Sequence, residues 1–476
     1  MDKELLAKVG EFVESNRDTI ISELFEMCRI DSVRGEPEEG APYGRKCMFA
    51  LEKVAEIAGR YGLSTEINRK YGYSVTSLGE GDKSVAVIGH TDVVPAGDAW
   101  EKTQAFEPKL IDGVLYGRGV RDDKGGVLAG IYVQRAIKEL KIPVKSRILT
   151  VAGSAEETGM QDIRDFYKNY KPQPTVSMVA DSDFSVCHCE KDVFRCEVLS
   201  KKPFELVKDF SAGIANNAVP GTANAIFPDK EGLFAALSAI CEKDDDLSIC
   251  RENGEIKVHA KGISTHGAYP KGSKSALHTL ANALYTCSAI CENDRKILEA
   301  AAVSTEGYYG EGLGIAKEDE QTGKLVCTCG LARTENGKLH LSFNSRLCIS
   351  ADEAYAKRGF ERFFGEKYDF EILLTDYGKG YYKDANDPLI LCMLNSYREV
   401  SGIQDAKPYV MPGGTYAKYL ENAYAFGYST LRSVGDVPQG HGKAHQPDES
   451  MRLCCLLEAF KTYIMAAVEL DKAINE

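Results

Sequence analysis

A histidine and an aspartate stand two residues apart at the end of an apolar segment. The segment Ser84-Val-Ala-Val-Ile-Gly-His90 has no polar alternation, and Thr91 and Asp92 follow it. Residues i and i+2 of a strand lie on the same face. Asp92 can therefore accept the second N–H of the His90 imidazole and fix its tautomer, as outer carboxylates do for metal-binding histidines. A core histidine beside a surface aspartate is the alternative interpretation of this pair alone.

Two further apolar segments also end in acidic side chains. The segment 147–157 (RILTVAGSAEE) ends in Glu156 and Glu157, and the segment 175–181 (TVSMVAD) ends in Asp181. Apolar segments without polar alternation are typical of strands that are covered on both faces of a parallel sheet. Ligands of open α/β sheets bind beyond the carboxyl ends of the strands. Three strand ends with such side chains therefore predict a site at this edge.

The two adjacent glutamates suggest a division of labour. Adjacent side chains point in different directions, so we expect one of Glu156 and Glu157 to bind a metal ion and the other to transfer protons. Two solvated glutamates at a helix N-terminus, favoured by the helix dipole, are the alternative. Imidazole and carboxylate together suit borderline divalent metal ions. No clustered Cys₄ site is present in the sequence, which argues against a structural zinc finger.

The arrangement of predicted elements divides the chain into two parts. Strands and helices alternate up to about residue 190, which indicates an α/β layer fold. Beyond that point short strands mix with helices in an α+β pattern. A final helix, strand and long helix follow residue 384. We predict an α/β domain from residues 1–190 and 384–476, interrupted by an inserted α+β domain at 191–383. Within the insertion the sequence predicts strands at 193–199, 255–260 and 338–349 and helices at 230–241, 273–291 and 353–364.

Composition excludes several classes of function. The chain has 476 residues and a net charge of −13, from 71 acidic and 58 basic residues. This acidity argues against nucleic acid and anionic membranes as partners. The sequence has no run of about 18 apolar residues and therefore predicts no transmembrane helix. Fifteen cysteines are scattered without a signal peptide, which favours reduced thiols and a cytoplasmic protein.

A series of motifs resembles one family of enzymes along nearly the whole chain. The motifs occur in this order: GHTDVVPAGDAW (89–100), LYGRGVRDDKGG (115–126), SAEETG (154–159), ADSDFSV (180–186), ANNAVPGTANA (215–225), GISTHGAYPKG (262–272), GEGLGIAKEDEQTGKL (310–325), NSR (344–346), PGGTYA (412–417) and AHQPDE (444–449). Together they resemble the di-zinc peptidase family of aminoacylases, carnosinases and desuccinylases. Within it they are most similar to the bacterial dipeptidase V-like branch, the Xaa-His dipeptidase type.

The resemblance implies a zinc-peptidase-like catalytic domain, a lid domain and a pair of metal ions. His90 and Asp181 would hold one ion. Glu157 and His445 would hold the other, and Asp122, the first residue of the Asp-Asp-Lys-Gly segment, would bridge the two. The ions would be zinc, with manganese or cobalt as alternatives that accept similar ligands. Two divalent ions, three ligand carboxylates and a bridging hydroxide sum to zero charge, which a partly buried site tolerates.

The same resemblance implies roles for catalytic and substrate-binding residues. Glu156 would act as the general base, with Asp92 behind His90, and His266 of the lid would stabilise the oxyanion. The substrate-binding residues would be Asn217, Arg346, Gly413, Gly414 and Thr415. Arg346 would bind the terminal carboxylate.

The expected activity is hydrolysis of dipeptides with a free N-terminus by a hydroxide held between the two ions. An N-acyl amino acid deacylase or desuccinylase with the same metal site is the alternative, and a non-catalytic metal-binding or ligand-sensing protein is the third. We expect a monomer, because the long insertion resembles a double lid that replaces a dimer partner. Departures from the family pattern beside Asp181, Gly413 and Arg346 concern substrate preference more than metal binding. His441, four residues before His445, is an alternative ligand.

Overall fold

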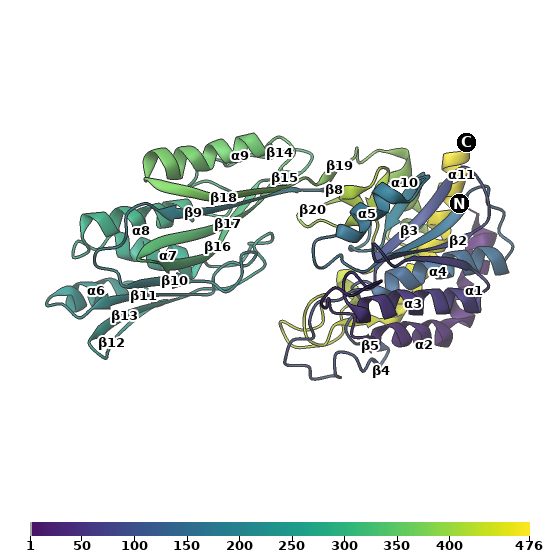
Figure 1. The fold of residues 1–476 in the computed structure, drawn as a ribbon, viewed down its shortest axis with the longest axis horizontal. Coiled ribbons are helices and arrows are strands. Elements are labelled where there is room, and N and C mark those ends of the chain that lie inside the picture. The colour runs from purple at the N-terminus through teal and green to yellow at the C-terminus, as the bar shows by residue number, and fades with distance from the viewer. Residues whose placement is uncertain (1) are drawn as a thin grey trace. The chain divides into compact units, whose positions relative to one another are not determined.

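The chain forms two compact units in a computed structural model, which describes residues 2–476 (Figure 1). Unit 1 consists of Met1–Glu190 and Lys383–Glu476, and unit 2 consists of Lys191–Tyr382. Unit 2 is therefore an insertion in the chain of unit 1. Among residues 2–476, no helix combines the length and the apolar character that crossing a bilayer requires.

A six-stranded sheet forms the centre of unit 1. Its order is β1 (Ser64–Asn68), β2 (Tyr73–Leu78), β6 (Arg147–Gly153), β3 (Ser84–His90), β7 (Val176–Val179) and β21 (Ala423–Ala425). β3 runs parallel to both β6 and β7, and β21 runs parallel to β7. All seven residues of β3 are buried, as the apolar sequence predicts for a strand covered on both faces.

Helices cover this sheet. They are α1 (Lys3–Ser15), α2 (Arg17–Cys28), α3 (Arg45–Arg60), α4 (Lys124–Glu139), α5 (Gln161–Asn169), α10 (Pro388–Ser401) and α11 (Leu453–Asn475). α4 packs on β3 and β6, and α11 packs against α4, α1 and α10. Local signals set some helix ends. Asp387 caps α10 by accepting the N–H of Leu389, and Gly402 ends that helix with a left-handed φ of 75°, a conformation that glycine adopts without steric cost.

Smaller elements complete unit 1. β22 (Ser450–Arg452), β5 (Val114–Tyr116) and β4 (Lys109–Ile111) form an antiparallel sheet. β8 (Cys187–Glu190) pairs in parallel with β20 (Tyr409–Met411). Two 3₁₀ turns are η2 (Tyr416–Tyr419) and η3 (Leu431–Ser433). The β22–β5 pair ties the segment around residue 450 to the segment that precedes α4.

An antiparallel eight-stranded sheet forms the centre of unit 2. Its order is β12 (Leu247–Glu252), β13 (Glu255–Lys261), β11 (Thr222–Pro228), β10 (Asp209–Ala212), β16 (Val326–Glu335), β17 (Lys338–Leu347), β9 (Asp192–Ser200) and β18 (Phe370–Gly378). Buried and accessible residues alternate along β11 and β13. This alternation indicates that one face of the sheet is packed and the other is open to solvent.

The remaining elements of unit 2 are mostly helical. They are α6 (Leu233–Cys241), α7 (Ala276–Tyr285), α8 (Glu292–Ser304), α9 (Glu353–Phe360) and the π-helix η1 (Glu361–Lys367), with short strands β14 (Glu318–Asp319), β15 (Gly323–Lys324) and β19 (Tyr381–Tyr382). α7 packs on β11 and β13, and α9 packs on β9. The helices and the sheet share one apolar core. Units 1 and 2 confirm the predicted fold class, an α/β domain interrupted by an α+β insertion.

Candidate metal centre

The carboxyl ends of three neighbouring parallel strands bring the predicted ligands of unit 1 to one edge. His90 ends β3, Glu156 and Glu157 follow β6, and Asp181 follows β7. The N–H of Ala180 donates to the carbonyl of Ile88 at 2.8 Å, so the chain keeps the sheet register up to Asp181. This is the edge where ligands of open α/β sheets bind.

Two groups of donor atoms share Asp122. Nε2 of His90 lies 3.0 Å from Oδ1 of Asp122. Nε2 of His445 lies 3.0 Å from Oδ2 of Asp122 and 2.9 Å from Oε1 of Glu157. The donor atoms of His90, Asp122 and Asp181 lie within 4.8 Å of one another, and so do those of Asp122, Glu157 and His445. Each oxygen of Asp122 therefore faces a different histidine, which is the arrangement that a bridging carboxylate needs.

The two glutamates after β6 are held through their backbone. Oδ1 of Asp92 accepts the N–H of Glu156 and Oδ2 accepts the N–H of Glu157, both at 3.1 Å. Glu156 is 9% exposed, and it lies with Glu157 near His90 in a third donor group. Nδ1 of His90 is 3.0 Å from the backbone oxygen of Asp92 and 3.5 Å from its Oδ1. Asp92 thus contacts His90 as well as the turn that carries both glutamates.

The electrostatics of the centre reflect crowded carboxylates. Burial raises the pKa of Glu156, and the Asp181 carboxylate raises it further. Burial, followed by the Asp122 carboxylate, raises the pKa of Asp181 to about 7. Hydrogen bonds to Asp122 and Glu157 raise the pKa of His445 to about 11. Several carboxylates thus share one small volume, and positive charge in their midst would stabilise them.

Buried acidic residues that the sequence did not single out hold the ligand-bearing loops. Asp162 accepts the N–H groups of Ser154 and Ala155 at 2.6 and 2.9 Å, and the hydroxyl of Tyr416 at 2.6 Å. Glu449 accepts backbone N–H groups from the Asp122 loop. Glu449 falls within the AHQPDE motif, which is a signal, whereas nothing in the local sequence marks Asp162.

The predicted substrate loop of unit 1 follows β20. The hydroxyl of Thr415 donates to the Glu190 carboxylate at 2.6 Å and accepts the N–H of Ala417 at 3.1 Å, which caps η2. Burial raises the pKa of Glu190 to about 8. Gly413 and Gly414 precede this turn, and a Cβ on Gly414 would lie 2.9 Å from Nζ of Lys418. Gly414 therefore leaves room that Lys418 uses.

Two of the three predicted residues of unit 2 lie on adjoining loops. The N–H of Gly267 donates to the carbonyl of Asn217 at 2.7 Å, and Ala218 forms a β-bridge with His266. Asn217 and His266 are both exposed. The rings of His266 and Tyr269 are 6.0 Å apart. The structure thus brings Asn217 and His266 together within unit 2.

Arg346 lies on β17 of the same unit, opposite Val326. Burial lowers the pKa of Arg346 to about 10, and the nearby Arg195 lowers it further, while Tyr269 opposes the shift. The guanidinium has no ion-pair partner among residues 2–476. A partly buried guanidinium without a carboxylate is well suited to bind one from a ligand.

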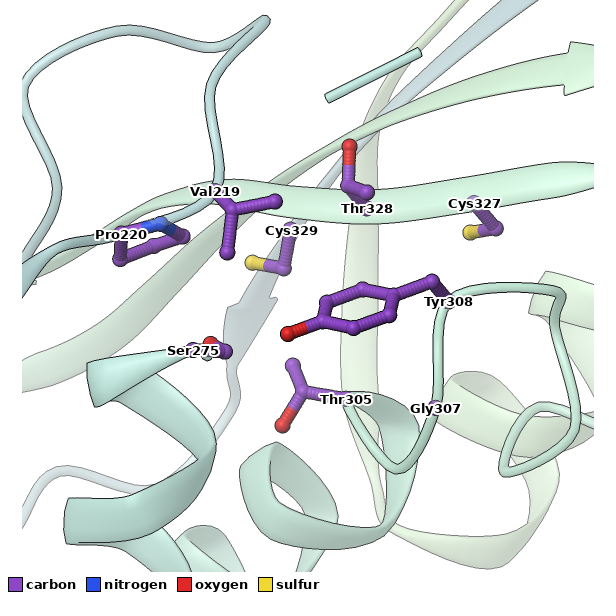
Figure 2. Close-up of a pocket in the computed structure, with 9 residues that line it drawn as sticks. All are labelled: Val219, Pro220, Ser275, Thr305, Gly307, Tyr308, Cys327, Thr328 and Cys329. Atoms are coloured by element: carbon purple, nitrogen blue, oxygen red, sulfur yellow. The ribbon is translucent and has the colours of Figure 1, made fainter. Parts of the chain in front are cut away.

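Other candidates lie apart from the donor groups. Nδ1 of His441 lies 2.7 Å from Oδ2 of Asp448, and within the described residues His441 belongs to none of the three donor groups. Cys327 and Cys329 are buried free thiols of unit 2. Figure 2 shows them beside a small pocket into which the ring of Tyr308 points. The pocket holds about 10 Å³, the room that one water needs.

An α/β domain with imidazole and carboxylate side chains at the ends of its strands, interrupted in the chain by an α+β unit, suits a metal-dependent hydrolase. Residues 86–469 match the model of peptidase family M20/M25/M40. The chain is 30% identical over 477 residues to the Beta-Ala-Xaa dipeptidase of Lactobacillus delbrueckii subsp. lactis, a match that covers 97% of this chain and 98% of the relative. The chain belongs to peptidase family M20/M25/M40 and is a hydrolase of peptide bonds, which confirms the resemblance and the predicted enzyme class.

Solved structures share the fold. Human carnosine dipeptidase 1 aligns with a TM-score of 0.57 at 15% identity, over 98% of this chain and 99% of that chain. The dipeptidase Dug1p of Saccharomyces cerevisiae aligns with a TM-score of 0.57 at 15% identity, over 98% of each chain. At this identity the likeness concerns the fold alone, and it extends over both units.

Proposed function

We propose that the chain is a metal-dependent dipeptidase that hydrolyses dipeptides with a free N-terminus. Membership of peptidase family M20/M25/M40 and the dipeptidase name of the relative at 30% identity support this activity. The observation that carries the proposal is the placement of Asp122, whose two carboxylate oxygens each lie 3.0 Å from a different histidine. That placement suits a carboxylate shared by two ions.

The donor set fits divalent cations. It comprises the imidazoles of His90 and His445 and the carboxylates of Asp122, Glu157 and Asp181. Two imidazoles and three carboxylates suit a pair of zinc ions, and manganese and cobalt accept the same ligands. Two divalent charges would compensate the crowded carboxylates. We propose zinc as the resident ion and treat manganese and cobalt as outcomes of the test.

The chemistry needs an activated water and a proton carrier. Bound divalent ions would lower the pKa of a water and polarise the scissile carbonyl. Glu156 would take a proton from that water as its oxygen bonds to the carbonyl carbon. Glu156 would then give the proton to the leaving nitrogen as the C–N bond breaks. The hydrogen bond that the backbone N–H of Glu156 donates to Oδ1 of Asp92 would hold Glu156 in place for both transfers.

Residues of unit 2 would bind the substrate. The imidazole of His266 would donate a hydrogen bond to the oxyanion that develops on the scissile carbonyl. Arg346 would bind the terminal carboxylate through two parallel hydrogen bonds. Because that carboxylate lies a fixed distance from the scissile amide, this contact favours substrates of two residues. Asn217 and the Gly413–Thr415 loop would supply further polar contacts.

We further propose a cytoplasmic monomer. The fifteen cysteines are free thiols, which supports a reducing compartment. The length of unit 2, 192 residues, supports a protein that works as a single chain. Light scattering at micromolar concentration should give the mass of one chain, and an obligate dimer would overturn this part of the proposal.

A substrate panel on metal-free protein tests the activity. The protein is stripped with a chelator and supplied with zinc, manganese or cobalt, and each form is assayed with Ala-Leu, β-Ala-His and N-succinyl amino acids. We expect turnover of the free dipeptides only after a metal is restored. Preference for the acylated compounds would make the chain a deacylase or desuccinylase instead, with the same metal centre.

A further inference from the structure

The buried carboxylate of Glu449 accepts hydrogen bonds from the loop that carries Asp122. Oε1 of Glu449 accepts the backbone N–H groups of Gly119 and Arg121 at 3.0 Å each and that of Asp122 at 3.1 Å. Oε2 accepts a hydrogen bond from Nη1 of Arg118 at 2.7 Å. Glu449 is fully buried and Arg118 is 2% exposed. Four donors on one carboxylate thus fix the backbone on which Asp122 stands.

The partner arginine is itself anchored on several sides. Arg118 donates to the carbonyls of Pro95 and Ala96 at 3.3 and 3.2 Å and to that of Gln446 at 3.3 Å. Its guanidinium also lies 5.4 Å from the centre of the Trp100 ring. A buried ion pair gains little net stability, because desolvation offsets the attraction. What this pair supplies is a single geometry for the segments that it joins.

The same segment also carries His445. Glu449 stands four residues after His445 and directly before β22, where Ser450 pairs with Tyr116 of β5. The N–H of Gly117 donates to the backbone oxygen of Glu449 at 3.0 Å. The chain around Glu449 is therefore bonded to the loop before α4 through its backbone and its side chain. This connection holds His445 and Asp122 at their 3.0 Å separation.

We propose that Glu449 is a positioning residue that orients Asp122 between the two donor groups. Glu449 thereby sets the affinity for the second of two divalent ions, the one that Asp122, Glu157 and His445 would hold. The inference rests on the proposed function, since it assumes two ions. The two donor groups depend on Glu449 to different degrees. In the group of Asp122, Glu157 and His445, two members depend on the Glu449 segment, whereas in the group of His90, Asp122 and Asp181 only Asp122 does.

Glu449→Gln removes the charge while keeping the shape. The amide oxygen can still accept backbone N–H groups, but the amide nitrogen then faces the guanidinium of Arg118, and donor opposes donor. We expect the Asp122 loop to shift and the second ion to bind about 10–100-fold more weakly, the usual size of effects from residues behind metal ligands. The first ion should lose less affinity, because Asp122 is the one member of its donor group that depends on the Glu449 segment, and His90 and Asp181 keep their positions.

Calorimetric titration of the metal-free proteins with zinc chloride, and separately with manganese chloride, tests the inference without an activity assay. The wild type should bind in two steps, and Glu449→Gln should weaken the second step more than the first. Glu449→Asp keeps the charge on a shorter side chain and should restore part of the affinity. Glu458→Gln, on the partly buried Glu458 that pairs with Arg432, is the matched control and should match the wild type.

Three results would overturn the inference. Equal weakening of both steps in Glu449→Gln, or no weakening, would leave Glu449 as a fold-stabilising residue only. Should Glu449→Gln fail to fold, as circular dichroism would show, Glu449→Asp decides by the same criterion of an asymmetric loss. A wild type that binds one ion in a single step would contradict the proposed function itself and would be recognised before any variant is compared.

Discussion

The His90 side of the candidate metal centre in unit 1 and two of the three predicted substrate residues of unit 2 differ in how they are held. His90 is fully buried, and the carboxylates of Asp92 and Glu449 hold the ligand loops by accepting two and three backbone N–H groups, respectively. Asn217 and His266 are exposed and lie on loops. Rigid placement suits metal ligands, whereas exposed side chains are accessible to a substrate that arrives from solvent. We propose that unit 1 carries the metal-dependent chemistry and that unit 2 adds substrate contacts and the oxyanion donor His266.

The largest expected effect is a loss of kcat on removal of the proton carrier of unit 1. Glu156→Gln removes the proton carrier and keeps the volume, so kcat should fall by about 10²–10⁴-fold, the usual contribution of a general base. Metal content, measured by atomic emission, should stay at the wild-type level. Glu139→Gln, on a surface glutamate paired with Arg135, is the control. Loss of metal from Glu156→Gln would mean that the roles of Glu156 and Glu157 are reversed.

His266→Ala tests whether unit 2 takes part in the chemical step. Removal of one oxyanion donor should lower kcat by about 10²–10³-fold, with metal affinity unchanged. His340→Ala provides the matched control, because His340 is a unit 2 histidine that contacts Glu335. Kinetics of His266→Ala that equal those of the wild type would remove His266 from the mechanism and restrict unit 2 to binding.

Arg346→Lys separates recognition from chemistry. The lysine keeps the charge but loses the planar pair of donors, so KM for dipeptides should rise by about 10-fold or more, as the loss of a charge-assisted bond predicts. The kcat at saturating substrate should change little. Arg333→Lys, at an exposed position of β16, should have no effect. A fall in kcat with constant KM would instead assign Arg346 to the transition state.

Tyr416→Phe should have the smallest effect. It removes only the hydroxyl that donates to Asp162 at 2.6 Å, while Asp162 keeps the backbone N–H groups before Glu156. A buried hydrogen bond contributes about 0.5–1.5 kcal/mol, so we expect a loss of about 2- to 10-fold in kcat. Steady-state kinetics at saturating metal measure it. A loss as large as that of Glu156→Gln would mean that Tyr416 takes part in the reaction directly.

The two units also differ in how well the sequence predicts them. The segment 84–90 predicts β3 with its ends, because a strand buried on both faces is apolar between its first and last residues. The strand ends then indicate which side chains meet, since parallel neighbours end at the same edge. The assembly of the centre at that edge follows from local patterns, although the pairing of His445 with Asp122 depends on contacts between distant segments.

The parts that remained unpredictable depend on tertiary contacts. The predicted helix 273–291 is shorter in the structure, where α7 ends at Tyr285. The hydroxyl of Thr286 bonds back to the carbonyls of Asn282 and Ala283, which competes with continuation of the helix. Glu449 and Asp162 act on N–H groups of other segments. No periodicity marks a residue of that kind, and its role becomes visible only once the chain is folded.

The proposed chemistry depends on two ions that share Asp122. Crystals of the zinc-loaded protein, measured on both sides of the zinc absorption edge, test it most directly. We expect two anomalous peaks about 3.5–4 Å apart, one bonded to Oδ1 and the other to Oδ2 of Asp122. A single peak at full zinc loading, or two peaks of which one has no contact with Asp122, would contradict it.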